Sequence, residues 1–132
     1  MKFRASFCDP FQKAIIEMGE IEKDKIIETF EKTDWADFLK RMEGKPDSEV
    51  FYSPSLEIEN IENKNGLSIS AIEEGETYGF GIFYKRPAKH KPGLFRSNEV
   101  LTEIWDQNAD DVVKCLNALI NNDLEFLENA IQ

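Results

Sequence analysis

Two alternating segments joined by a short turn constrain the fold of this chain more than any other feature of its sequence. In Leu67–Ile72 and again in Tyr78–Tyr84, apolar side chains recur at every second residue, which is the period of a strand with one buried face. A turn at Glu74-Gly75 would pair Ala71 with Tyr78 and bring the apolar residues of both strands to one face. Those residues are Leu67, Ile69, Ala71, Tyr78, Phe80 and Ile82. The sequence therefore predicts an antiparallel hairpin.

The opposite face of this hairpin carries two glycines. Gly79 and Gly81 alternate with the apolar residues of the second strand. A missing side chain at such a position either admits a close neighbour, such as a helix or a partner, or marks a bulge or a local twist. Both interpretations stay open at the level of sequence.

Further strands are predicted on both sides of the hairpin. Lys2–Phe7 and Val100–Trp105 alternate between apolar and polar residues, Val50–Tyr52 is a short apolar run, and Leu56–Ile61 is a further candidate strand. The segment Gln12–Met18 fits either an extension of the sheet or a helical turn. These segments raise the expected size of the sheet to about four to six strands.

The connection between Leu56–Ile61 and the hairpin does not fit a two-residue turn. A turn at Asn65-Gly66 would set charged residues opposite apolar ones on the same face. A loop from about Glu62 to Gly66, with a bulge near Glu59–Asn60, aligns the apolar residues of both strands instead. We therefore expect the longer loop.

Three stretches have the spacing of amphipathic helices. Apolar residues recur at helical intervals in Asp24–Met42, with a break expected near Thr33. Asn108 is a suitable N-cap for a second helix, which Asn121-Asn122 ends, and Asp123–Ile131 starts a third. The sequence therefore predicts one α+β domain spanning residues 1–132. It consists of an antiparallel sheet with helices at about 24–42, 109–121 and 123–131 packed on it.

The residue types that carry most catalytic and metal chemistry are scarce. The chain has two cysteines, Cys8 and Cys115, with no metal-motif spacing, and a single histidine, His90, in a Pro- and Lys-rich segment. No apolar run is long enough for a signal segment or a membrane span. We therefore expect a cytoplasmic protein with reduced thiols, no metal, no cofactor and no enzymatic activity.

The charges are distributed unevenly along the chain. The formal net charge is −10, from 26 acidic and 16 basic residues. Residues 56–84 carry six acids and one base, residues 99–132 carry eight acids and one base, and residues 85–98 carry five bases and no acid. This acidity disfavours nucleic acids and anionic membranes as partners, because both are polyanions. It leaves a basic protein partner open.

Two sets of charged residues are candidate binding residues. Clustered acids on predicted strands, turns and helix starts suit a basic partner, and they equally fit a solvated surface. These acids are Glu57, Glu59, Glu62, Glu73, Glu74, Glu76, Asp106, Asp110 and Asp111. The basic segment 85–96 offers Arg86, Lys89 and Arg96 to an anionic ligand, or else its cations neutralise the protein's own acids.

Residues 24–131 resemble, in general style, the small bacterial immunity proteins that neutralise secreted polymorphic toxins. The resembling segments are Lys32–Trp35, Tyr52–Asn60, Asn65–Ser70, Phe83–Pro87 and the closing acidic helix pair. Such a resemblance implies a non-enzymatic cytosolic protein that binds a cognate toxin, which is basic where the inhibitor is acidic. The leading hypothesis is therefore neutralisation of a basic toxin, such as a nuclease, through acidic patches. The alternative is a small regulatory or anion-binding domain that uses the basic segment. The sequence does not indicate an oligomeric state.

Overall fold

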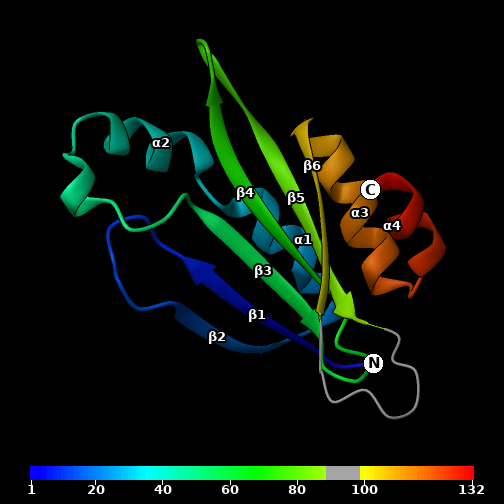
Figure 1. Ribbon diagram of the computed structural model, residues 1–132. Coiled ribbons are helices and arrows are strands. Elements are labelled where there is room, and N and C mark those ends of the chain that lie inside the picture. Colours follow the sequence, from blue (N-terminus) through cyan, green and yellow to red (C-terminus); the bar gives the residue numbers. More distant parts are fainter. Residues whose placement is uncertain (89–98) are drawn as a thin grey trace.

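The protein is an α+β domain in which helices cover one face of a six-stranded antiparallel sheet, as the sequence predicts (Figure 1). This computed structural model describes residues 1–88 and 99–132. The strand order is β2-β1-β3-β4-β5-β6, and all neighbouring strands are antiparallel. The strands are β1 (Phe3–Cys8), β2 (Ile16–Ile21), β3 (Ser55–Asn60), β4 (Gly66–Glu74), β5 (Thr77–Pro87) and β6 (Glu99–Gln107).

The β4–β5 hairpin has the predicted faces but a different register. Ala71 pairs with Phe80 rather than with Tyr78, so the two turn residues are Gly75 and Glu76. Gly75 has a φ of 65°, which a glycine adopts without strain as the first residue of a tight hairpin turn. Because the register differs by two residues, the apolar side chains still reach the helix side of the sheet.

The β3–β4 connection is the longer loop that the sequence predicts. Leu56 pairs with Ile69, and β3 pairs with β4 in regular register, without the bulge expected near Glu59–Asn60. Buried Asn60 holds the turn, since its Oδ1 accepts the backbone N–H of Glu62 at 2.9 Å. Ile61 lies outside the strand, and its N–H donates to the Lys2 carbonyl at 2.9 Å.

The first predicted helix is divided as expected. Helix α1 (Lys23–Lys32) ends at Thr33, and α2 (Trp35–Glu43) begins after Asp34, whose side chain accepts the Asp37 N–H. Trp35 is 4% exposed, and its indole N–H donates to the Phe30 carbonyl at 3.2 Å. Trp35 is therefore a core residue whose one polar group is satisfied.

The C-terminal helices complete the helical layer. Helix α3 (Ala109–Ile120) begins with a capping box between Asn108 and Asp111, and α4 (Leu124–Ala130) begins at Asp123. Helix α3 packs on β4 and β5 and against α1 and α4. Large side chains fully buried between sheet and helices include Tyr84, Phe3, Ile58, Ile82, Leu116 and Leu127.

The structure corrects one predicted strand, lengthens another and decides one open case. Val50–Tyr52 forms no strand; it follows the short 3-10 helix η1 (Asp47–Glu49) and runs to β3 as a loop. Gln12–Met18, which fits a sheet extension or a helical turn by sequence, leads into the edge strand β2. The strand predicted over Tyr78–Tyr84 is longer, because β5 continues to Pro87 and pairs there with β6.

Candidate functional site

One face of the sheet has no helix over it in the described part of the chain, and we call it the open face. Strand alternation sends alternate side chains of each strand to this face. Its charged side chains include Arg4 and Lys85 together with a larger number of carboxylates. Those carboxylates are Glu17, Glu20, Glu57, Glu59 and Glu103. The open face is therefore acidic.

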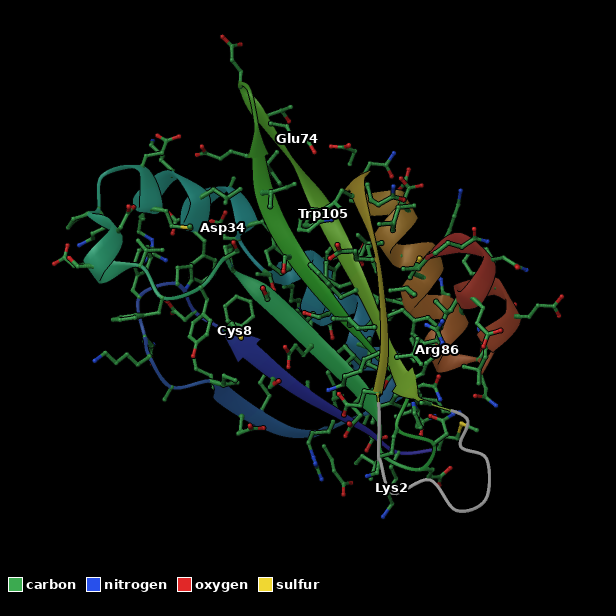
Figure 2. All side chains as sticks on the ribbon, viewed as in Figure 1. Lys2, Cys8, Asp34, Glu74, Arg86 and Trp105 are labelled. Atoms are coloured by element: carbon green, nitrogen blue, oxygen red, sulfur yellow. The ribbon has the colours of Figure 1, made fainter. Side chains whose placement is uncertain are left out.

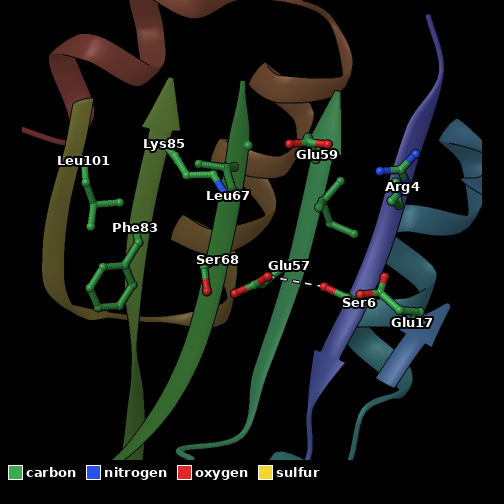
Figure 3. Close-up of a pocket in the computed structure, with 12 residues that line it drawn as sticks. Arg4, Ser6, Glu17, Glu57, Glu59, Leu67, Ser68, Phe83, Lys85 and Leu101 are labelled. Atoms are coloured by element: carbon green, nitrogen blue, oxygen red, sulfur yellow. Dashed lines mark hydrogen bonds between the residues drawn. The ribbon is translucent and has the colours of Figure 1, made fainter. Parts of the chain in front are cut away.

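A groove of about 490 Å³ crosses the open face (Figure 3). Glu57, Glu59 and Ser68 lie on the central strands, with Arg4, Ser6 and Glu17 on the β1–β2 side. Phe83, Lys85 and Leu101 line the β5–β6 side. The β5–β6 side thus combines two apolar side chains with one lysine, and the rest of the groove carries charged and hydroxyl groups. This combination suits an amphipathic peptide chain.

Glu57 and Glu59 are both held in the groove by β3. Ser6 Oγ donates to Glu57 Oε2 at 3.2 Å across the β1–β3 pair. Glu59 pairs directly with Arg4, which has Glu20 on its other side. Arg4 is exposed and forms no ion pair within 4 Å with any other residue of 1–88 and 99–132. Both carboxylates therefore remain available to a ligand.

The two glycines of β5 admit close neighbours from within the chain. The ring of Trp105 lies on the backbone of Gly81, where an added Cβ would meet ring carbons at 2.6 Å. The same ring meets Phe83 edge-on, with centroids 5.2 Å apart. The neighbour is thus a side chain of β6 rather than a helix or a partner. Trp105 and Phe83 together form an aromatic ridge along the open face.

Two pairs of carboxyl groups lie close together at the end of the molecule that carries the β4–β5 turn, where Figure 2 labels Glu74. The Glu74 carboxyl lies over Gly79 and beside Asp106. Its Oε1 is shielded from solvent and has no donor among the described residues. A hydrogen bond with Asp106, followed by desolvation and repulsion, raises the pKa of Glu74. Glu43 raises the pKa of Glu73 in the same way.

Two carboxyl groups can share a hydrogen bond only when one of them carries a proton. When both are ionised, their repulsion opposes folding. A basic partner at this end would remove that conflict by supplying cations. We call this surface the acidic end and define it by Glu43, Glu73, Glu74, Glu76 and Asp106.

The remaining predicted acids lie apart from these two surfaces or have structural roles. Asp111 accepts the Asn108 N–H at 3.1 Å and so completes the capping box of α3, with Asp110 beside it in the first turn. Glu62 is exposed in the β3–β4 turn. The nine predicted acids therefore do not form one continuous patch.

The two described basic residues of the segment 85–96, Lys85 and Arg86, point to opposite sides of the sheet. Lys85 lines the groove, whereas Arg86 points to the other side, where its guanidinium lies 4.4 Å from the Tyr84 ring centroid. Arg86 Nη1 also donates to Thr102 Oγ1 at 3.0 Å. Lys89, His90 and Arg96 lie outside the described residues. Arg86 is thus committed to the fold, which weakens its role in the anion-binding alternative.

The thiols have structural environments. Cys8 and Cys115 are both buried and free. Burial first, and then the Asp111 carboxylate, raises the pKa of Cys115 to about 11. Burial and Glu57 raise the pKa of Cys8. Both thiols are therefore protonated near neutral pH, which makes them poor nucleophiles.

Within residues 1–88 and 99–132, no group of three or more His, Cys, Asp or Glu side chains is arranged to hold a metal ion. No helix within these ranges has the length and apolar character needed to cross a membrane.

Of the residues that line the groove, the sequence singles out Glu57 and Glu59 as candidate binding residues and misses the others. Arg4, Glu17, Phe83, Lys85 and Leu101 join the groove only because β1 and β2 lie beside β3 while β5 and β6 lie beside β4. Their placement depends on strand order, which no local pattern encodes. A usable signal was present at Gly81, since a glycine facing away from the core points to a close neighbour on that face.

Comparisons of the chain with models of protein families, with curated proteins and with solved structures found no match. The functional argument therefore rests on the chemistry of the open face and the acidic end.

Proposed function

We propose that this protein is a non-enzymatic binding module that neutralises a basic protein toxin by occupying it with the open face of its sheet. The observation that carries the proposal is the groove across that face, where three carboxylates and two cations lie beside the apolar side chains of Phe83 and Leu101. A protein surface that presents Lys and Arg around an apolar patch would complement the carboxylates and the apolar side chains.

Charge supports a basic partner over an anionic ligand. The open face carries Glu17, Glu20, Glu57, Glu59 and Glu103 against Arg4 and Lys85. The acidic end extends the negative surface beyond the groove. Such a field speeds the association of a cationic protein and sets its specificity more than it adds affinity.

The proposed mechanism is steric and electrostatic. Glu57 and Glu59 would pair with cations of the toxin, while Leu101 and Trp105, which are 60% and 41% exposed, would bury against apolar groups. Exposed aromatic side chains of this kind commonly provide the energetic centre of an interface. For a toxin that is a nuclease, this contact would cover its nucleic-acid surface, which is basic because nucleic acids are polyanions.

Co-expression with a toxin tests the proposal. The candidate toxin is the C-terminal domain of a large secreted protein that we expect the neighbouring gene to encode. Expressed alone, that domain should arrest growth, and the present protein should restore it. If the neighbouring gene encodes no such protein, or if the protein leaves the arrest unchanged, the proposal is wrong.

Charge reversal locates the surface. The double variant Glu57→Lys with Glu59→Lys should abolish rescue, because it replaces attraction by repulsion in the groove. Glu31→Lys with Glu125→Lys makes the same change in net charge at exposed sites on α1 and α4 and should rescue fully. Equal loss in both variants would show that only bulk charge matters and would reject the open face as the binding surface.

A further inference from the structure

Among residues 1–88 and 99–132, no strand pairs with the outer edge of β6. β6 pairs with β5 in unbroken register from Glu99 to Ile104, and its register shift and the positive φ of Asp106, 60°, come only after this stretch. An edge strand presents unpaired backbone N–H and C=O groups to any strand that can approach. The opposite edge, β2, offers a shorter regular stretch, because its register shift falls in the middle of the strand beside Gly19, whose φ is 78°.

The β4–β5 hairpin determines which groups of β6 point outward. Glu74 and Thr77 flank a two-residue turn, so they exchange both hydrogen bonds, and the pattern alternates from there along β5. It follows that Thr102 directs its N–H and C=O toward β5, whereas Leu101 and Glu103 direct theirs to the free edge. The Trp105 carbonyl agrees with this alternation, since it accepts the side-chain amide of Gln107 at 2.9 Å.

The side chains on this edge define the chemistry of what can pair with it. On the open face, β6 presents Leu101, Glu103 and Trp105 in alternation, and all three are exposed. In an added strand, the residue opposite Glu103 would share its face, and so would the residues two positions away on either side. A Lys or Arg flanked in this way by apolar residues complements the edge.

A second copy of this chain is a poor occupant of the same edge. The charged side chains of β6 are all acidic: Glu99, Glu103 and Asp106. Those of β2, the other edge, are Glu17 and Glu20. Pairing β6 with β6 or with β2 of another copy would therefore bring acids together with no cation on either strand to compensate.

We infer that β6 accepts an extended segment of a basic partner as a seventh strand, with a Lys or Arg opposite Glu103 and apolar residues beside Leu101 and Trp105. Backbone hydrogen bonds at Leu101 and Glu103 would supply affinity, and the open-face side chains would supply specificity. This inference rests on the proposed function, because it takes the proposed basic protein as the source of the strand.

The first experiment titrates the full-length, 15N-labelled protein with two synthetic peptides. Both have the pattern apolar-Thr-X-Thr-apolar, with Val as the apolar residue and X as Lys or Glu. The Lys peptide should shift the amide resonances of Leu101, Glu103 and Trp105 and slow amide exchange at Leu101 and Glu103. The Glu peptide should bind at least about tenfold more weakly, because it places like charges opposite each other.

A pair of variants at residue 103 separates backbone pairing from charge. Glu103→Pro removes the outward N–H without touching the bonds to β5, and proline is tolerated at such an edge position. It should abolish the slowed exchange. Glu103→Gln keeps the N–H, so it should retain that protection while losing most of the preference for the Lys peptide. Unchanged resonances of core amides would show that both variants fold.

Several results would overturn the inference. These are equal binding of the two peptides, shifts confined to other strands, unchanged protection in Glu103→Pro, or a dimer through β6 in sedimentation. The toxin co-expression separates it from the proposed function. No rescue by the wild-type protein rejects the function, whereas equal rescue by wild type and Glu103→Pro rejects only the added strand.

Discussion

At the scale of single residues, Tyr84 connects the sheet to the turn that follows β3. Its side chain is fully buried, and its hydroxyl donates to Asn65 Oδ1 at 2.6 Å. Asn65 in turn bonds to Asn63 through its backbone and side-chain N–H groups. Asn65 thus faces inward and orders the loop, which explains why Asn65-Gly66 does not act as a two-residue hairpin turn here.

Removing the Tyr84 hydroxyl should destabilise the fold. Tyr84→Phe leaves the buried Asn65 carbonyl without its donor, which costs about 1–3 kcal/mol. Urea denaturation followed by circular dichroism should show a lower midpoint with an unchanged slope. The control is Tyr78→Phe, since Tyr78 is 36% exposed, and it should change stability by less than about 0.5 kcal/mol. Equal effects of the two substitutions would contradict this role for Tyr84.

The Glu74–Asp106 contact predicts an unusual pH dependence. The folded-state pKa of Glu74 is raised, so protonation favours folding at acidic pH, and this contribution is lost as pH rises through the folded pKa. Glu74→Gln should therefore raise the melting temperature at neutral pH, because the amide can donate to Asp106. The gain should shrink as the pH falls through the ordinary carboxyl range.

The matched control for this prediction is Glu76→Gln. Like Glu74→Gln, it removes one negative charge close to the β4–β5 turn, so it measures the effect of net charge alone. Glu74→Gln should stabilise the protein clearly more than Glu76→Gln at neutral pH. A pH-independent gain, or equal gains in the two variants, would show that the carboxyl contact does not influence stability.

At the scale of elements, periodicity predicts which segments form strands and helices, but not how the strands are ordered. The faces of β4 and β5 are as expected because the side-chain period of a strand is two. The register differs by two residues because Gly75 takes the first turn position. Helix caps at Asp34, Asn108 and Asp123 lie where local chemistry places them. Val50–Tyr52 is apolar without being a strand, since short apolar runs do not specify pairing.

The close packing of the Trp105 ring on Gly81 predicts that one methyl group added to β5 lowers the stability of the fold. In Gly81→Ala, the new Cβ would overlap the Trp105 ring and displace it from the sheet. The cost should be about 1–3 kcal/mol, which is typical of overpacking. In a Trp35→Phe background, Trp105 fluorescence should shift to longer wavelength as the ring gains contact with water.

Gly44→Ala provides the control for this element. An added Cβ there meets no atom within 4 Å, so stability should change by less than about 0.5 kcal/mol and the fluorescence should not move. Equal stability and equal Trp105 fluorescence in Gly81→Ala and Gly44→Ala would show that Trp105 is not tightly packed on Gly81.

At the scale of the whole molecule, the two faces of the sheet have different roles. The helix-covered face holds the core, and the open face presents five carboxylates against two cations together with exposed apolar residues. The open face therefore carries one part of the net charge of −10, and the acidic end and the helices carry further acids. Sequence reasoning identifies Glu57 and Glu59 but not Arg4, Glu17 or Phe83, because strands distant in sequence meet only in the folded sheet. The acids at Asp110 and Asp111 belong to a helix start instead.

Binding of a basic protein toxin at the open face can be tested by hydrogen–deuterium exchange of the full-length protein, with and without a toxin domain that it neutralises in co-expression. We predict slower exchange in β3, β5 and β6, unchanged exchange in α3 and α4, and a smaller effect at high salt. Protection confined to the helices, or no protection at any strand of the open face in a verified complex, would show that the open face is not the binding surface.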